Sequence, residues 1–422
     1  MDFVTERAAT LARQVREFVD TRVIPVEAEI FAENAAKGGL ARADGPAGPG
    51  TAFALDPRIE ELKTQAREAG LWNLFLPRGH EDAYPAELAP AGGPLSNLDY
   101  AAVAEQTGRS FLAPLVMNTN APDTGNMEVL LTHGSREQQD TWLVPLLEGR
   151  IRSAFLMTEP DVASSDASNM AATAVIDGDE VVLNGTKWWS SGAGHPQCEV
   201  GIFMGVTDPE ADRRARHSMV LVPMSAPGVK VERMLSAMGH YDEPLGHGEV
   251  SLTDVRLSLD HIINGPGKAS QIAQDRLGPG RVHHCMRLIG LAERALELAI
   301  ARSTSRTAFG RPIAELGGNR ERLAKARIEI NAARLLVLDC AFKLDRDGVA
   351  GALSEVSEIK AHVPRVACEV IDMAIQLHGG AGVSADTPLA AAYAGARSLR
   401  LADGPDEVHL GVVARRMLKG AR

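Results

Sequence analysis

Two short polar stretches, joined by a pattern typical of a β-hairpin, constrain this chain more than any other feature. Phe155 to Ser165 reads FLMTEPDVASS, and Lys187 to Gly192 reads KWWSSG. Between them, residues 171–176 alternate in polarity, residues 177–179 (Asp-Gly-Asp) favour a turn, and residues 180–183 are mainly β-branched and apolar. We therefore expect one small sheet to bring the two stretches together.

The residue types in these stretches suit a flat ligand with a charged tail. Thr158, Ser164 and Ser165 offer hydroxyls and backbone N–H groups, whereas Trp188 and Trp189 offer flat apolar faces. A planar heterocycle that carries a pyrophosphate needs a stacking wall and a row of donors. The alternative is a surface loop followed by tryptophans of the core, although aromatic residues make up only 4% of the chain.

These motifs resemble the flavin loops of the acyl-CoA dehydrogenase family. Its members carry TEP-x-x-G-S-D and then a second loop with a tryptophan and a hydroxyl residue; this chain has TEPDVASSD and then NGTKWWSSGA. The WWSSGA form resembles one branch in particular, the dehydrogenase part of proteins that also carry a kinase-like domain, together with stand-alone bacterial relatives. Residues 161–163 (Asp-Val-Ala) and one extra serine replace the usual glycine-rich turn, which leaves open whether Ser164 or Ser165 contacts flavin or CoA.

Patterning divides the chain into helical, strand-rich and again helical regions. Strand-like runs cover 171–176, 180–183, 200–206, 218–223, 229–233 and 247–252; helical periodicity covers 59–69, 98–107, 125–133, 135–147, 282–304, 320–345, 354–377, 389–398 and 405–418. An N-terminal helix ends or kinks at Pro25, Ser135 with Gln138 resembles a capping box, and Pro364 predicts a kink or fraying. Residues 38–51 read as an exposed loop.

The resemblance implies an α+β multidomain fold that matches this division. We expect an N-terminal α-helical domain over 1–150, a middle β-barrel-like domain over 151–268 and a C-terminal helical bundle over 269–422. Long helices with short connections independently favour a bundle for the last region.

Charge and cysteine content exclude several classes of partner. The formal net charge is −11, which argues against nucleic acid or an anionic membrane surface, since both need a basic face. A local arginine cluster could still hold an anionic ligand; Arg213, Arg214 and Arg216 form either a solvated hairpin tip or a contact to a CoA phosphate. The four cysteines lack CxxC or zinc-ligand spacing, so we expect neither a metal site nor disulfides.

The first twenty residues predict no targeting segment. They are amphipathic and contain acids, so they lack both the apolar core of a signal peptide and the acid-poor character of a transit peptide. No apolar run in the sequence reaches membrane-spanning length. We therefore predict a cytoplasmic protein with no membrane partner.

Oxidation of a thioester between its α and β carbons needs three groups. A carboxylate removes the α-proton, hydrogen-bond donors stabilise the enolate, and a cofactor accepts the β-hydrogen as hydride. The sequence has no G-x-G-x-x-G between a strand and a helix with a following acid, which disfavours nicotinamide. FAD is therefore the predicted cofactor.

Asp403 is the predicted catalytic base. The family usually places a glutamate just before a glycine between its last two helices, and Asp403-Gly404 occupies that position. A few relatives take the glutamate from the first bundle helix before an arginine, but Gly280 precedes Arg281 here. Aspartate reaches about 1.5 Å less than glutamate, so either the backbone lies closer or the reaction is slow or different. The alternative is that Asp403 caps the last helix, a role compatible with the first.

The resemblance assigns the remaining site residues. Arg306 and Phe309 match R-x-x-F-G, whose arginine reaches the flavin pyrophosphate across a subunit interface, and Gln376, Gly379 and Gly380 match a Q-x-x-G-G loop given to the neighbouring flavin. The full cofactor set is Phe155, Met157, Thr158, Ser164, Trp189, Ser190, Ser191, Arg306, Phe309, Gln376, Gly379, Gly380, Pro405 and Glu407. The substrate set is Ser165, Arg281 and Gly404.

Several of these residues keep a structural alternative. Arg281 could be a plain helix-start arginine, and the glycines a helix C-cap. His283 and His284 are adjacent on a helix, so they point apart and cannot easily share a metal; one faces the acyl pocket or both are hydrogen-bonded core residues. Residues 316–317 are Leu-Gly where the family often has His-Gln, which removes one adenosine contact.

The resemblance predicts FAD-dependent α,β-dehydrogenation of an acyl-CoA. An alternative within the class is flavin-assisted elimination of phosphate from a 4-phosphoryloxyacyl-CoA in hydroxy-acid catabolism. An alternative of another class is a non-catalytic flavin or acyl-CoA binding or assembly protein. Expected partners are an acyl-CoA, an electron-transferring flavoprotein and further copies of the chain in a homodimer or homotetramer.

Overall fold

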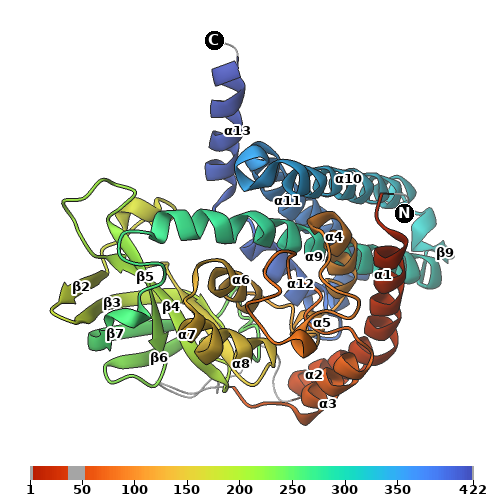
Figure 1. Ribbon diagram of the computed structural model, residues 1–422. Helices are drawn as coiled ribbons and strands as arrows, with labels where there is room; N and C mark the ends of the chain where they lie inside the picture. Colours follow the sequence, from red (N-terminus) through yellow and green to blue (C-terminus); the bar gives the residue numbers. More distant parts are fainter. Residues whose placement is uncertain (1–2, 37–52, 421–422) are drawn as a thin grey trace. The chain divides into compact units, whose positions relative to one another are not determined.

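The computed structural model describes residues 3–36 and 53–420, without the side chains of 34–36, 274–279 and 420. The exposed loop expected over 38–51 falls outside the described residues. The chain forms two compact units (Figure 1). The helical unit comprises Met1–Arg42, Leu95–Pro114 and Gly278–Arg422, and the sheet unit comprises Ala43–Pro94 and Leu115–Leu277. The domain boundaries at 150 and 268 stay a prediction.

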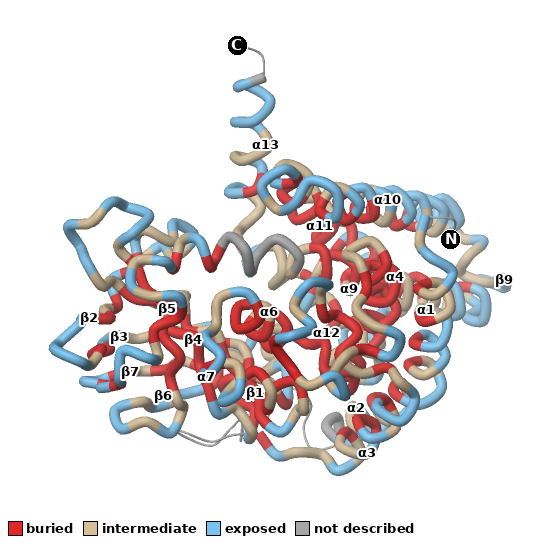
Figure 2. The backbone as a smooth tube through the Cα atoms, viewed as in Figure 1, coloured by how far each residue is buried: buried red, intermediate tan, exposed pale blue. Residues whose placement is uncertain are grey.

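The helical unit is a bundle of long helices, as the periodicity predicted. Its helices are α1 (Glu6–Phe18), α2 (Ile24–Ala36), α4 (Asn97–Thr107), α9 (Ala269–Ser305, which starts in the sheet unit), α10 (Asn319–Gly351), α11 (Leu353–His378), α12 (Leu389–Ser398) and α13 (Asp406–Gly420). A two-stranded ribbon, β8 (Thr307–Ala308) and β9 (Arg311–Pro312), follows α9. The outer turns of α10 and most of α13 are exposed (Figure 2).

Two helices widen into π-helical turns just before a proline. The π turn η1 (Val19–Val23) precedes Pro25, and η3 (Gln139–Leu143) precedes Pro145. Proline lacks an N–H group and its ring clashes with the carbonyl four residues earlier, and a wider turn relieves that clash. The expected helix end or kink at Pro25 is thus a π turn, and the helix predicted over 135–147 is divided into α7 (Arg136–Gln138), η3 and α8 (Val144–Leu147). The capping box of Ser135 and Gln138 is confirmed.

Two glycines bring the backbones of α4 and α9 into contact. A Cβ added at Gly108 would lie 2.0 Å from the carbonyl oxygen of Arg287, and one added at Gly290 would lie 1.9 Å from that of Glu105. Neither position can hold a side chain unless the helices separate. The crossing therefore fixes the position of α9 around residues 287–290.

The sheet unit contains one seven-stranded sheet. Its strands are β1 (Arg152–Leu156), β2 (Thr173–Asp177), β3 (Glu180–Ser191), β4 (Cys198–Val206), β5 (His217–Pro223), β6 (Val229–Leu235) and β7 (His247–Ser258). They lie in the order β1-β4-β2-β3-β7-β6, with β5 paired to β4. Helices α3 (Pro57–Glu68), α5 (Ala113–Val116, which starts in the helical unit) and α6 (Asp123–His133) also belong to this unit. Strands β1, β4 and β5 are largely buried, whereas most of β2 is exposed (Figure 2).

The predicted hairpin is confirmed and is longer than expected. Strands β2 and β3 are antiparallel, Asp177 pairs with Glu180, and Gly178 turns with φ of 67°. Strand β3 continues through Ser191, so the tryptophan stretch expected as a loop is the end of a strand that pairs with β7. Strand β1 was not predicted, because Arg152 and Ser153 interrupt its apolar pattern.

Other predicted elements differ only in detail. Helix α11 continues through Pro364, so the fraying expected there does not occur, and the kink stays a prediction. Short 3-10 turns not predicted from the sequence occur at Ala86–Leu88, Ala167–Asn169, Leu259–His261, Ile313–Glu315 and Gly379–Val383. Among the described residues, no helix is long and apolar enough to cross a lipid bilayer.

Candidate functional site

A buried ion pair ties the two polar stretches of the sheet unit together. Lys187 is fully buried on β3, and its Nζ lies 2.7 Å from Oε1 of Glu159 in the TEP turn. The same Nζ donates to the carbonyl oxygens of Met157 at 3.0 Å and Met204 at 2.7 Å. The turn after β1 is thus fixed directly to β3, as the hairpin pattern indicated.

Glu159 is held as a carboxylate by donors on several sides. Its two oxygens accept the backbone N–H groups of Ala171 at 2.8 Å and Ala172 at 3.1 Å in addition to the lysine. Burial alone would raise the pKa of Glu159, but the hydrogen bonds and charge of Lys187 and the two amides lower it. Burial lowers the pKa of Lys187 to about 8, which still lies above neutral pH, so the pair stays charged there.

The end of β3 turns one tryptophan outward. The register shifts between Lys187 and Ser190, and Trp189, with φ of 51°, is 40% exposed. The Oγ of Ser190 and the Nε1 of Trp188 are buried without a hydrogen-bond partner among the described residues. An accessible ring face beside unused polar groups is what a bound heterocycle requires, so these residues fit a flavin.

The serines of the first stretch point in different directions. The Oγ of Ser164 accepts the N–H of Glu159 at 2.9 Å and so stabilises the turn itself, whereas Ser165 is exposed. Ser191 instead lies 2.9 Å from Nδ1 of His247 on β7. Phe155, Met157 and Thr158 are half-buried.

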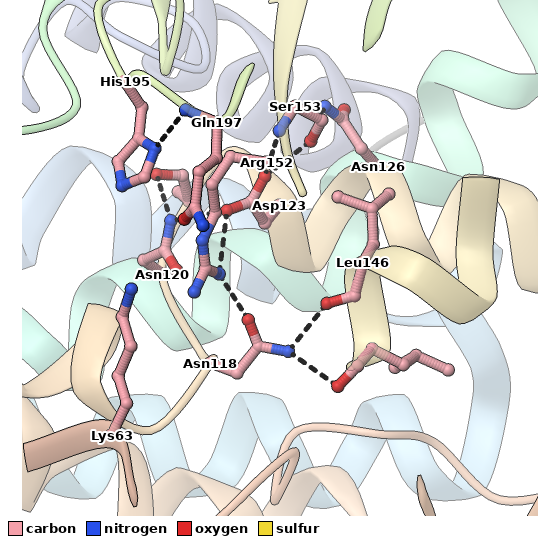
Figure 3. Close-up of polar contacts among 12 residues, drawn as sticks. Lys63, Asn118, Asn120, Asp123, Asn126, Leu146, Arg152, Ser153, His195 and Gln197 are labelled. Carbon is pink, nitrogen blue, oxygen red and sulfur yellow. Dashed lines mark hydrogen bonds and ion pairs between the residues drawn. The ribbon is translucent and has the colours of Figure 1, made fainter. Parts of the chain in front are cut away.

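A second buried charged group fixes the start of β1 (Figure 3). Asp123 on α6 accepts the N–H of Ser153 at 2.7 Å and its Oγ–H at 2.6 Å, and it lies 3.4 Å from the Nη1 of Arg152. Arg152 also donates to Asn118, and all of these side chains are buried. The motifs indicated no site residue before 150; the detectable signal was two polar residues, Asp123 and Asn126, close together at the start of α6.

In the helical unit, the backbone of Asp403 is tightly held. Asp403 has φ of 55°, and its carbonyl oxygen accepts from Arg281 through Nε at 3.3 Å and Nη2 at 3.1 Å. Nε2 of His409 lies 3.1 Å from the same oxygen, and Lys360 donates to the carbonyl of Gly404 at 3.3 Å. Three basic side chains from α9, α13 and α11 thus fix a turn whose backbone is strained.

The carboxylate of Asp403 faces α9. Its Oδ2 lies 3.4 Å from Nε2 of His284, and its side chain is 24% exposed. Helix α13 begins at Asp406, three residues later, so Asp403 is not the residue directly before the helix. The structure therefore brings Asp403 and Arg281 together from the predicted site residues and adds His284, Lys360 and His409.

The other predicted residues of this unit are mostly exposed. Phe309 is 95% exposed with φ of 51°, and Arg306, Gln376, Gly380 and Glu407 are also exposed. Gly379 ends α11 with φ of 63°, which confirms the C-cap reading. A Cβ at Gly379 or Gly380 would meet nothing within 4 Å, so a ligand or another chain could approach this backbone closely. Pro405 and Gly404 are half-buried.

The two adjacent histidines of α9 have different surroundings. The ring of His283 is buried edge-on against Tyr100, with centroids 4.6 Å apart, and burial holds the pKa of His283 well below its usual value. His284 faces Asp403 instead. No group of three or more potential metal ligands occurs in the part of the chain that the structure describes.

Comparison with known proteins agrees with this architecture. Family models for the acyl-CoA dehydrogenase middle domain and C-terminal domain match residues 154–255 and 270–418. A Mycobacterium tuberculosis protein described as probable acyl-CoA dehydrogenase FadE2 is 47% identical over 98% of this chain and 96% of its own length. A solved structure from Mycobacterium abscessus, described as an acyl-CoA dehydrogenase, is 61% identical, with a TM-score of 0.93 over 99% of this chain and 100% of the other.

Longer relatives match as well. Mouse acyl-CoA dehydrogenase family member 10 is 49% identical over 97% of this chain, which covers 37% of that relative. This chain spans about half the length or less of several curated relatives. The chain belongs to the acyl-CoA dehydrogenase family, whose members are flavin-dependent oxidoreductases that bind FAD.

Proposed function

We propose that this protein oxidises an acyl-CoA thioester between its α and β carbons, with Asp403 as the base that removes the α-proton. The observation that carries the proposal is the placement of Asp403, a partly exposed carboxylate on a turn fixed by Arg281, Lys360 and His409. When the backbone of the base is fixed, its carboxylate stays at one position, close to the α-carbon of the bound thioester. The N–H of Asp403 is the proposed donor to the thioester oxygen.

The turn would also compensate for the shorter side chain. Arg281 on α9 donates to the carbonyl of Asp403 through two N–H groups and so holds this backbone beside the helix. A closer backbone would compensate for the roughly 1.5 Å that aspartate lacks relative to glutamate. In this view Arg281 serves the base, and its predicted contact with CoA stays a prediction.

The cofactor residues fall into two groups. We propose that the β1 turn and the end of β3 hold FAD through Phe155, Met157, Thr158, Ser164 and the residues 189–191. The exposed Arg306, Phe309, Gln376, Gly379 and Gly380, with Pro405 and Glu407, would hold FAD of a neighbouring copy in a homodimer or homotetramer. When bound, FAD supplies the acceptor for the β-hydrogen as hydride. Electrons would then pass to an electron-transferring flavoprotein.

Anaerobic bleaching tests the proposal. The yellow protein is mixed with butanoyl-CoA, octanoyl-CoA and hexadecanoyl-CoA, and flavin absorbance is followed for the parent, Asp403→Asn and Asp406→Asn. Asp406 is a matched control because it pairs with Arg400 at 2.7 Å beside the same turn. We expect bleaching in the parent, at least hundredfold slower bleaching in Asp403→Asn, and little change in the control. Equal rates in parent and Asp403→Asn would exclude Asp403 as the base.

A second candidate function is elimination of phosphate from a 4-phosphoryloxyacyl-CoA. It is favoured by the WWSSGA stretch, which resembles the kinase-linked branch, and by the greater length of several relatives. Here Asp403 would still remove the α-proton. Release of inorganic phosphate without an added electron acceptor would support this function, and strict dependence on an acceptor would argue against it. Yellow protein that no thioester bleaches would instead favour the non-catalytic binding role.

A further inference from the structure

We propose that His284 is a positioning residue for Asp403 and that Arg287 holds it in the single tautomer that can do this. The inference rests on the proposed function, because it takes Asp403 to be the base. It adds two residues of α9 that neither the sequence motifs nor the family comparison assigns to the site. The proposal rests on two successive contacts, one from Arg287 to His284 and one from His284 to the carboxylate of Asp403.

The three residues involved lie along one side of α9. Arg281, His284 and Arg287 recur every third residue, a spacing that places successive side chains next to one another on a helix. Arg281 contacts the backbone carbonyl of Asp403, and His284 contacts its carboxylate. One helix therefore fixes both the main chain and the side chain of the base.

The direction of the hydrogen bonds decides the tautomer of His284. Nη2 of Arg287 lies 3.2 Å from Nδ1 of His284. A guanidinium can only donate, so Nδ1 must accept and carries no proton. The proton of the neutral ring is then on Nε2, which lies 3.4 Å from Oδ2 of Asp403 and can donate to it. A proton on Nδ1 would instead point at the N–H groups of the guanidinium, where it finds no acceptor.

Helix α9 is tightly packed at Arg287, where this series of contacts begins. The carbonyl of Arg287 lies against Gly108, and Gly290, one turn further on, lies against the carbonyl of Glu105. These backbone contacts leave α9 no room to move toward α4. The guanidinium that sets the tautomer therefore extends from a part of α9 whose backbone is packed directly against α4.

The neighbouring histidine shows that the arrangement is specific. His283 is one residue away on the same helix, yet its ring is buried against Tyr100. His283 therefore lies on the same helix as His284 and is also a histidine of low exposure, but it faces away from Asp403. His283→Gln is accordingly a matched control for any change made at His284.

The tautomer is tested directly by nitrogen NMR of histidine side chains in the FAD-loaded protein. The chain has 12 histidines, so the His284 signals are identified by their loss in His284→Gln. We expect an unprotonated Nδ1 and a protonated Nε2 at neutral pH. An unprotonated Nε2, or a doubly protonated ring, would overturn the assignment.

The positioning role is tested by two substitutions with opposite expectations. Glutamine can place an amide N–H near the position of Nε2, whereas leucine keeps volume without a donor. In anaerobic bleaching with octanoyl-CoA, or with whichever of the three thioesters the parent uses, we expect His284→Leu to be about ten- to hundredfold slower at saturation. His284→Gln should stay within about threefold of the parent, and His283→Gln should match it once equal FAD content is confirmed.

The outcomes separate this inference from the proposed function. If Asp403→Asn is slow but His284→Leu matches the parent, the positioning role is wrong and the base assignment stands. If Asp403→Asn matches the parent, the proposed function itself fails. If Leu and Gln at His284 are equally slow, the donor is not what matters and the inference is overturned.

Discussion

The two units hold their site residues in opposite ways. In the sheet unit, buried ion pairs hold the polar stretches and the start of β1, Lys187 with Glu159 and Arg152 with Asp123. In the helical unit, most residues predicted to serve a flavin are exposed, up to 95% for Phe309. The difference suggests that the sheet unit builds its part of the site from its own core, whereas the bundle presents residues to something beyond the chain.

This contrast predicts where a substitution acts. Removing one partner of a buried pair leaves an uncompensated charge in a dry environment, so the cost falls on folding. An exposed residue contributes little to the folded state, so its loss should be felt only when a ligand or partner binds. Asp403 lies between these cases, since its turn is fixed but its carboxylate stays accessible.

The largest effect is expected at Glu159. Glu159→Gln removes the charge that Lys187 faces and should lower the free energy of unfolding by about 3 to 5 kcal/mol, measured by urea denaturation. The matched control is Asp166→Asn in the same stretch, whose pair with Arg213 is largely exposed. That change should cost at most about 0.5 kcal/mol. Similar losses in both variants would contradict the contrast.

Acid should weaken each unit through a histidine that is kept neutral. Burial, with the charges of Arg152 and Lys63, lowers the pKa of His195 from 6.5 to about 3, and burial with the charge of Arg281 lowers that of His409 to about 4. Below pH 6.5 the unfolded chain binds these protons and the folded chain does not. The stabilisation that these two neutral histidines give the folded state is therefore complete above pH 6.5 and is lost as the pH falls below it.

The size of this loss can be measured. Between pH 6.5 and 5 each histidine should remove about 2 kcal/mol from the free energy of unfolding. Urea denaturation of His195→Gln and His409→Gln should each show a shallower pH dependence than the parent. An unchanged slope in both variants would show that these rings already titrate in the folded protein.

A smaller effect, confined to binding, is expected at Arg306. Arg306→Ala should leave the free energy of unfolding of the FAD-free protein within about 0.5 kcal/mol of the parent. It should weaken FAD retention about tenfold to thirtyfold, because a charge-assisted contact to phosphate is lost. Arg311→Ala, in the second strand of the ribbon that directly follows Arg306, is the control. Loss of stability without loss of FAD would reverse the expectation for this unit.

Local chemistry made much of this fold predictable. The turn at Asp177-Gly178 and the alternation around it indicated the hairpin, and the helical periodicity placed α12 at its observed residues. The motifs also indicated Asp403. Strand β1 was missed because its polar residues at 152 and 153 find their contact in Asp123, some thirty residues away.

The sequence could not show which residues that lie far apart along the chain contact each other. Nothing local distinguishes His284, which faces Asp403, from His283, which packs on Tyr100. The choice depends on the rotation of α9, which is set where Gly108 and Gly290 meet the neighbouring backbone. Likewise, the hold of Arg281 on the carbonyl of Asp403 joins residues more than a hundred positions apart.

Exchange of the α-hydrogens of an acyl-CoA for solvent deuterium tests the central claim most directly, because it reports removal of the α-proton alone. The FAD-loaded protein is incubated with the thioester in deuterium oxide, and label at the α-carbon is followed by mass spectrometry. We predict rapid exchange with the parent and with Asp406→Asn, and exchange at least a hundredfold slower with Asp403→Asn. Exchange by Asp403→Asn at the parent's rate would contradict the account.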